Sequence, residues 1–136
     1  MIAPIARMSK TRILIVDDDR NLSRLAGMIL ESSGQYEVMI VNHALRALPA
    51  ARQFQPALML LDVDMPDKSG GDIAREASTD SRLRDIPVLF LTGLVSLKEA
   101  GTRQMESGGM RFLAKPVEPA LLLSCVAELV GLKAAA

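Results

Sequence analysis

Five short apolar blocks alternate with stretches of helical composition, and this alternation constrains the fold more than any other feature of the chain. The blocks are residues 13–16, 36–41, 57–62, 86–92 and 111–115. Four of them are almost continuously apolar, which is typical of strands buried on both faces of a parallel sheet. We therefore expect an α/β fold with a five-stranded parallel sheet and helices on both faces. Because crossovers are right-handed, few strand orders remain, and the flavodoxin-like order 2-1-3-4-5 is favoured.

The segments between the blocks carry helix signals. Apolar residues from Leu22 to Leu30 share one face of a helix, with Asp19 as a candidate cap before it and Gly34 as a stop after it. Further helices are expected over 43–54, 71–78, 96–107 and 118–132. Pro49 should kink or shorten the second helix, and Gly101 should weaken the fourth.

Composition excludes several classes of protein. The 136 residues suit one domain, and 16 basic against 16 acidic side chains give no charge excess for nucleic acid or an anionic membrane. Cys125 is the single cysteine, so no internal disulfide can form. The opening "MIAPIARMSK" lacks the apolar run of a secretion signal, and no stretch is long enough to span a membrane. We expect a cytoplasmic protein.

Polar side chains stand where the predicted strands end. Asp17 and Asp18 follow the first strand, Asp62 ends the third, Thr92 ends the fourth and Lys115 ends the fifth. In a doubly wound sheet, ligands bind beyond the carboxyl ends of the strands, where the strand order reverses. That point lies between strands one and three in the order 2-1-3-4-5, so these side chains are expected to meet there.

This set of side chains indicates phosphoryl chemistry. Three converging carboxylates repel one another, and a hard divalent cation such as Mg²⁺ offsets that repulsion. A hydroxyl and an ammonium group suit the oxygens of a phosphoryl group. Asp62 is the candidate nucleophile. Taken singly, Asp17 and Asp18 could cap a helix, Thr92 could be a turn residue and Lys115 a solvated charge, but the joint occurrence favours one site.

Four motifs in order, "ILIVDDD", "LLDVDMPDKSG", "IPVLFLTG" and "FLAKPVEP", resemble the receiver domain of two-component response regulators over residues 12–132. The resemblance implies that Asp62 accepts a phosphoryl group from a phosphohistidine, on a sensor histidine kinase or a histidine phosphotransfer protein. It further implies that Asp17, Asp18, Asp62 and the backbone carbonyl of Asp64 hold Mg²⁺.

The same resemblance assigns the switch. Thr92 would bond the phosphoryl group, Lys115 would pair with it, Pro116 would be the family's cis proline, and Phe112 would turn inward when Thr92 moves. Asp64 and Leu94 occupy the positions that tune water attack in this family, and both depart from the commonest residue types there.

As a receiver, the chain would signal by changing its surface rather than by turning over a separate substrate. Residues 94–132 would form the surface that an effector domain or partner protein reads, with a homodimer left open and no contact to nucleic acid or membrane by this domain.

Two other classes of protein share part of this pattern. The "DVD" at 62–64 is also the nucleophile motif of haloacid-dehalogenase-type phosphatases, but there it lies on the first strand and not the third. A pseudo-receiver that binds partners without phosphorylation is disfavoured because the acid, threonine and lysine set is complete. His43 is assigned no role, and Cys125 is expected in the core.

The expected organisation is a flexible extension over 1–10, a receiver domain over 11–132 and a tail over 133–136. The final "AAA" is either the natural end of a stand-alone receiver or the remnant of a cloning vector after a piece cut from a longer regulator. The absence of capping or packing logic in these alanines favours the second interpretation.

Overall fold

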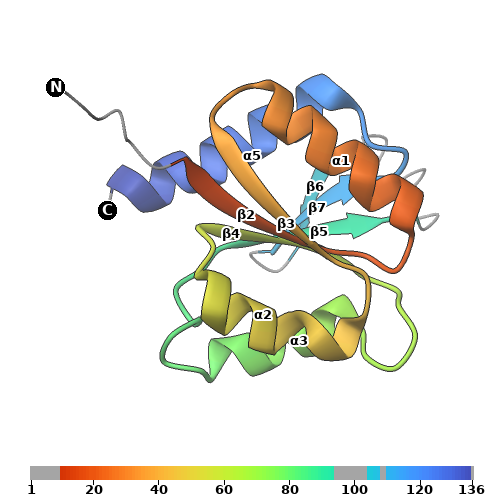
Figure 1. Cartoon of the computed structure of the whole chain (residues 1–136), viewed down its shortest axis with the longest axis vertical. Helices are drawn as coiled ribbons and strands as arrows, with labels where there is room; N and C mark the ends of the chain where they lie inside the picture. Colours follow the sequence, from red (N-terminus) through yellow and green to blue (C-terminus); the bar gives the residue numbers. More distant parts are fainter. Residues whose placement is uncertain (1–9, 94–103, 108–109, 136) are drawn as a thin grey trace, which may run out of the picture.

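A computed structural model describes residues 10–93, 104–107 and 110–135. In chain order its elements are β2 (Thr11–Val16), α1 (Arg20–Ser32), β3 (Tyr36–Val41), the 3-10 turn η1 (Ala44–Arg46), α2 (Ala47–Phe54), β4 (Leu58–Asp62), α3 (Gly70–Ser78), β5 (Val88–Thr92), β6 (Gln104–Ser107), β7 (Met110–Ala114) and α5 (Pro119–Ala135). The strands of this part of the chain form one sheet in the order β3-β2-β4-β5-β7-β6 (Figure 1).

The five predicted strands are all present, and their order confirms the expected 2-1-3-4-5 topology. Each neighbouring pair from β3 through β2, β4 and β5 to β7 is parallel. Parallel pairing brings the carboxyl ends of all five strands to the same edge of the sheet. The position of the polar residues that follow these strands is therefore set by topology.

β6 was not expected. Residues 104–107 were predicted as the end of a helix over 96–107, and that prediction is wrong for them because they pair antiparallel with β7. The remainder of that helix, 94–103, lies outside the described residues. The register pairs Ser107 with Met110, so two residues, both glycine, separate the strands. Pairing with β7 outweighs the helical composition of residues 104–107.

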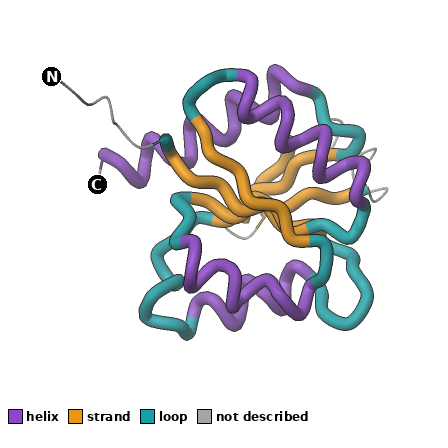
Figure 2. Tube along the Cα trace, viewed as in Figure 1, coloured by secondary structure: helices purple, strands orange, loops and turns teal. Residues whose placement is uncertain are grey.

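Helices cover both faces of the sheet, α1 and α5 on one side and α2 and α3 on the other (Figure 2). Alternate residues of each central strand face opposite layers: Ile13 and Ile15 of β2 pack with α1 and α5, whereas Leu14 and Val16 pack with α2 and α3. All four are fully buried, which stabilises the fold by about 2 kcal/mol per side chain. Cys125 is buried in the layer beneath α5, as predicted.

The helix boundaries follow from their capping residues. The Asp19 carboxylate accepts a hydrogen bond of 3.0 Å from the Leu22 N–H and so caps α1, as predicted. The second helix is shorter than predicted, as expected from Pro49: η1 occupies 44–46, α2 begins only at Ala47, and Pro49 lies in its first turn. Proline is tolerated there because the N–H groups of the first turn have no partner within the helix.

α5 extends beyond the predicted end at 132 and reaches Ala135. Within the part of the chain that the structure describes, none of the helices has the length and apolar content that a membrane crossing needs.

Candidate functional site

The predicted polar residues meet at the carboxyl edge of the sheet. A cavity of about 360 Å³ opens there, lined by Asp18, Asp19, Asp62, Val63, Asp64, Thr92, Gly93 and Lys115. Asp17 is fully buried and lies outside this lining, while Asp62 and Thr92 are only 3% and 4% exposed. Strand ends from β2, β4, β5 and β7 thus place a hydroxyl, an ammonium and several carboxylates around one space.

Lys115 is the cation that meets the buried acids. Its Nζ lies 3.0 Å from Asp62 Oδ1 and 3.4 Å from Asp17 Oδ2. Burial raises the pKa of Asp62 to about 6, Lys115 opposes that rise, and the negative charge of Asp17 adds to it. Burial also disfavours the charged form of Lys115, but its hydrogen bond to Asp62 and the charge of Asp17 outweigh that cost, so the pKa of Lys115 is raised.

The acids are arranged as ligands for a divalent cation. Asp17, Asp18 and Asp62 each offer one carboxylate oxygen, and these three oxygens lie within 4.8 Å of one another. Asp17 Oδ1 accepts a hydrogen bond of 2.9 Å from the Asp19 N–H. Asp17 Oδ2 is buried without a hydrogen-bond partner among the described residues. The ammonium of Lys115 faces this oxygen at 3.4 Å but is shared with Asp62, so one positive charge serves two buried carboxylates. A divalent cation would offset the remaining negative charge, and oxygen ligands suit Mg²⁺. Asp17, Asp18 and Asp62 therefore fit a bound Mg²⁺ ion.

Asp64 and Leu94 are the two residues expected to tune the attack of water on the phosphoryl group. Asp64 is exposed and lines the cavity, so its carboxylate lies near the rim rather than among the buried acids. Leu94 lies outside the described residues.

Phe112 stands apart from the acidic cavity. It pairs in register with Phe90 of β5, and the two rings stack with centroids 5.1 Å apart at an interplanar angle of 24°. Its partly buried side chain packs in the layer of α2 and α3. Together with Val63, Phe90, Met110 and residues of α3 it lines a largely apolar groove. Phe112 is two residues before Ala114, which pairs in register with Thr92. Its side chain lines the apolar groove and not the acidic cavity.

The connection after β7 is tied to the end of β5. The Lys115 N–H donates a hydrogen bond of 2.9 Å to the carbonyl of Thr92. The peptide bond between Lys115 and Pro116 is cis, as the resemblance implied. Lys115 is therefore held at its backbone by β5 and at its side chain by Asp62.

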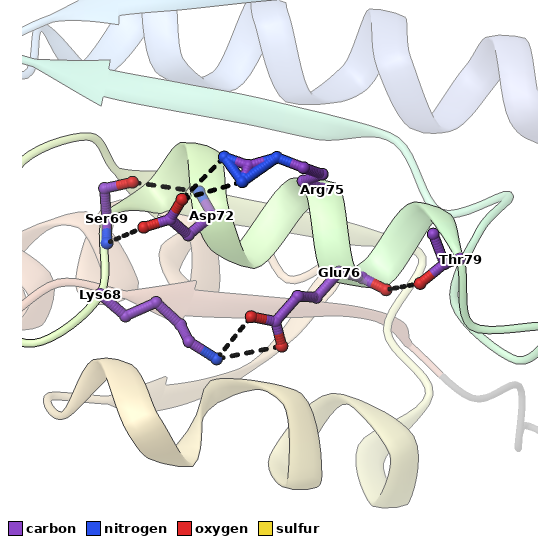
Figure 3. Close-up of polar contacts among 6 residues, drawn as sticks. All are labelled: Lys68, Ser69, Asp72, Arg75, Glu76 and Thr79. Atoms are coloured by element: carbon purple, nitrogen blue, oxygen red, sulfur yellow. Dashed lines mark hydrogen bonds and ion pairs between the residues drawn. The ribbon is translucent and has the colours of Figure 1, made fainter.

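A capping box and an ion pair anchor the start of α3, which follows the loop from Asp62 (Figure 3). The Ser69 hydroxyl accepts a hydrogen bond of 3.0 Å from the Asp72 N–H, and Asp72 accepts one from the Ser69 N–H. Lys68 Nζ lies 2.9 Å from the carboxylate of Glu76, eight residues further along the chain on α3. The loop that carries Asp64 is thus fastened to α3 at its far end.

Gly70, the first residue of α3, packs directly against the acceptor strand. Its N–H donates to the Val63 carbonyl at 3.1 Å. A Cβ added at Gly70 would overlap the carbonyl oxygen of Asp62 and would lie 3.3 Å from Val63 Cα. φ is not positive at Gly70, so a left-handed backbone is not the reason for a glycine at this position. Gly70 is needed for close backbone approach.

Gly70→Ala is expected to destabilise the protein by about 1 to 3 kcal/mol, because the methyl group must push backbone rather than a flexible side chain. Gly71→Ala is the matched control. Among the described residues, an added Cβ there meets Ser69 Oγ at an ordinary contact distance of 3.7 Å, so we expect a change between neutral and about 1 kcal/mol of stabilisation. Urea unfolding measures both, and equal effects would contradict the close-approach argument.

Sequence reasoning missed two residues that contact the site. Gly70 could have been found only from the tertiary approach of α3 to β4. Asn42 follows β3 directly, as the other polar residues follow their strands, and its side chain donates a hydrogen bond of 2.7 Å to the carbonyl of Asp17. Its position after a strand was the available signal.

Comparison with known proteins shows the family to which the chain is related. The response regulator receiver domain family matches residues 13–127. The DNA-binding dual master transcriptional regulator RpaA of Synechocystis is 34% identical over 119 residues, 88% of this chain and 48% of that protein. The polar-differentiation response regulator DivK of Brucella anthropi is 29% identical, covering 88% of this chain and 95% of DivK. A CheY-like response regulator receiver domain protein of Methanospirillum hungatei has a TM-score of 0.74 and 30% identity, covering 90% of this chain and 95% of that chain.

The chain therefore belongs to the response regulator receiver domain family. Its function is that of a phosphorylation-operated switch of two-component signalling, with a cluster of acids, Asp17, Asp18 and Asp62, that is compatible with Mg²⁺. The chain spans about half the length of RpaA and of the similarly related MtrA proteins of mycobacteria.

Proposed function

We propose that Asp62 is the phosphoacceptor, with Mg²⁺ held by Asp17, Asp18, Asp62 and the backbone carbonyl of Asp64. The observation that carries this proposal is the placement of Asp62 at the cavity wall, against Lys115 Nζ at 3.0 Å and within 4.8 Å of two further carboxylates. A nucleophile must stay ionised to attack, and burial raises the pKa of Asp62 to about 6. Lys115 already opposes the effect of burial in this value, and because the resulting pKa lies below 7 the carboxylate stays available as a nucleophile at neutral pH.

The donor is proposed to be a phosphohistidine on a sensor kinase or phosphotransfer protein. An Asp62 oxygen forms the new bond to phosphorus while the phosphorus–nitrogen bond breaks, and the imidazole leaves with the electron pair. When bound, the metal ion supplies positive charge beside the transferring oxygens. Lys115 moves from Asp62 to the phosphoryl oxygens, and the Thr92 hydroxyl donates a hydrogen bond to one of them.

The output is proposed to follow from these movements. Phe112 lies on β7 beside Phe90 and two residues before Ala114, so a shift of Thr92 can change its packing. We infer that the surface over residues 94–132 is read by an effector domain or partner protein in the cytoplasm, with Asp64 and Leu94 setting how fast water removes the phosphoryl group. Residues 11–132 would form the receiver unit.

Beryllium fluoride with Mg²⁺ tests the acceptor and the switch together, since it mimics a phosphoryl group on an aspartate. We expect amide signals of Val63, Thr92 and Phe112 to shift on its addition. Asp62→Asn is the control and should abolish all of these shifts. Shifts confined to 17–18 and 62–66 would show a pocket that binds without switching, and unchanged spectra would contradict the acceptor assignment.

A further inference from the structure

Asn42 makes contacts around the buried acid that the proposed chemistry does not use. Its Nδ2 donates hydrogen bonds of 2.7 Å to the carbonyl oxygen of Asp17 and 3.0 Å to Ser23 Oγ. Its Oδ1 lies 3.4 Å from an Arg20 guanidinium nitrogen. The amide thus has acceptors on its nitrogen side and a donor on its oxygen side, which is the orientation that satisfies both ends.

The Ser23 hydroxyl is itself committed, which makes it a fixed acceptor for Asn42. Ser23 is 1% exposed and lies in the first turn of α1. Its Oγ donates a hydrogen bond of 3.1 Å to the carbonyl of Arg20, so only its lone pairs remain for Asn42. The Asn42 amide is therefore aligned by one contact on α1 while it makes the other to Asp17.

The Asp17 peptide is held from β3 at both of its polar groups. Its N–H donates a hydrogen bond of 3.1 Å to the Val41 carbonyl, and its carbonyl accepts from Asn42. Backbone pairing between β2 and β3 ends at Val16 and Val41, so the Asn42 side chain continues that pairing beyond the strands. Asp17 and Asp18 lie where the chain leaves the sheet, at the point where backbone pairing would otherwise stop.

We propose that Asn42 is a positioning residue for the metal-binding acids. By holding the Asp17 carbonyl, with Ser23 aligning its amide, it keeps the turn at 17–19 in the conformation that brings the Asp17 and Asp18 carboxylates to Asp62. Groups that orient metal ligands without touching the ion commonly change metal affinity when removed. This inference rests on the proposed magnesium site.

The test is a Mg²⁺ titration of the whole chain, with amide signals near Asp62 as the readout, at a temperature where every variant is folded. We expect Asn42→Ala to raise the Mg²⁺ dissociation constant about three- to tenfold. Ser23→Ala should raise it less, because Asn42 still reaches Asp17. Since both act through one contact, Asn42→Ala combined with Ser23→Ala should be no worse than Asn42→Ala alone. Asn21→Ala, at an exposed position on α1, is the matched control and should bind as the wild type does.

A second readout separates positioning from general stability. In EDTA, the Asp19 amide, which donates to Asp17 Oδ1, should exchange its hydrogen faster in Asn42→Ala than in the Asn21→Ala control. A purely structural role would lower the urea midpoint yet leave the dissociation constant unchanged, and that result overturns the proposal. If Asn42→Ala does not fold, wild-type affinity in Ser23→Ala overturns it instead. A wild type that fails to bind Mg²⁺ overturns the magnesium site and this inference together.

Discussion

Asp62→Asn is expected to abolish labelling by acetyl phosphate, whereas the wild type should gain one phosphoryl group in the presence of Mg²⁺. The amide keeps the shape of the side chain but lacks a nucleophilic carboxylate oxygen, so the new bond to phosphorus cannot form. Chelating the metal should also abolish labelling of the wild type, because Lys115 alone then faces the negative charges of Asp17, Asp18 and the donor. Intact-mass spectrometry measures the label.

Asp64→Asn is the matched control for this experiment. Asp64 is also an acid on the cavity wall, two residues from Asp62, but it is exposed, and the substitution leaves its backbone carbonyl in place. We expect Asp64→Asn to be labelled, with an altered lifetime of the label. Equal labelling of the wild type and Asp62→Asn would show that another residue is the acceptor.

Lys115→Met should destabilise the metal-free protein by about 2 to 3 kcal/mol at pH 7. Methionine keeps much of the apolar stem but leaves Asp62 and fully buried Asp17 without their shared cation. Removing one partner from a buried ion pair is strongly destabilising, and the 23% exposure of the Lys115 side chain moderates the loss. Mg²⁺ should restore much of the difference, since it can neutralise the same carboxylates. Urea unfolding in EDTA and in Mg²⁺ measures both effects.

The same variant should show a steeper dependence of stability on pH. In the wild type, burial raises the pKa of Asp62 to about 6, so the folded protein binds a proton that the unfolded chain has released. The stabilisation that Asp62 contributes is fully present below about pH 4 and is lost as the pH rises through 6. The free energy of unfolding of the wild type should therefore fall by about 1 kcal/mol between pH 5 and 7. Without Lys115 the pKa of Asp62 rises further, so Lys115→Met should lose more stability over that interval.

Lys68→Met is the control for both Lys115 measurements. Lys68 also pairs with a carboxylate at 2.9 Å, but the side chain of its partner Glu76 is 50% exposed. We expect Lys68→Met to lower the free energy of unfolding by less than about 1 kcal/mol relative to the wild type. This difference should be the same at pH 5 and at pH 7. A pH dependence as steep as that of Lys115→Met would contradict the assignment of the effect to Asp62.

Local sequence determined the sheet and the residues at its edge. Continuous apolar runs specify buried strands, and parallel strands bring their carboxyl ends to one edge whatever the details of packing. Asp17, Asp62, Thr92 and Lys115 could therefore be placed together from the sequence alone, since each directly follows or ends its strand. The Asp19 cap was equally predictable, because its contact spans only three residues.

Only the tertiary structure decided how these residues are supported. Asn42 reaches Asp17 across 25 residues of sequence, and no local pattern specifies that contact. Gly70 matters because α3 approaches the Asp62 carbonyl, a distance set by how helix and sheet pack. β6 forms because 104–107 finds a partner in β7, where local composition favoured a helix. Strand ends are local consequences of sequence, whereas the contacts that hold them depend on which distant segments the fold brings together.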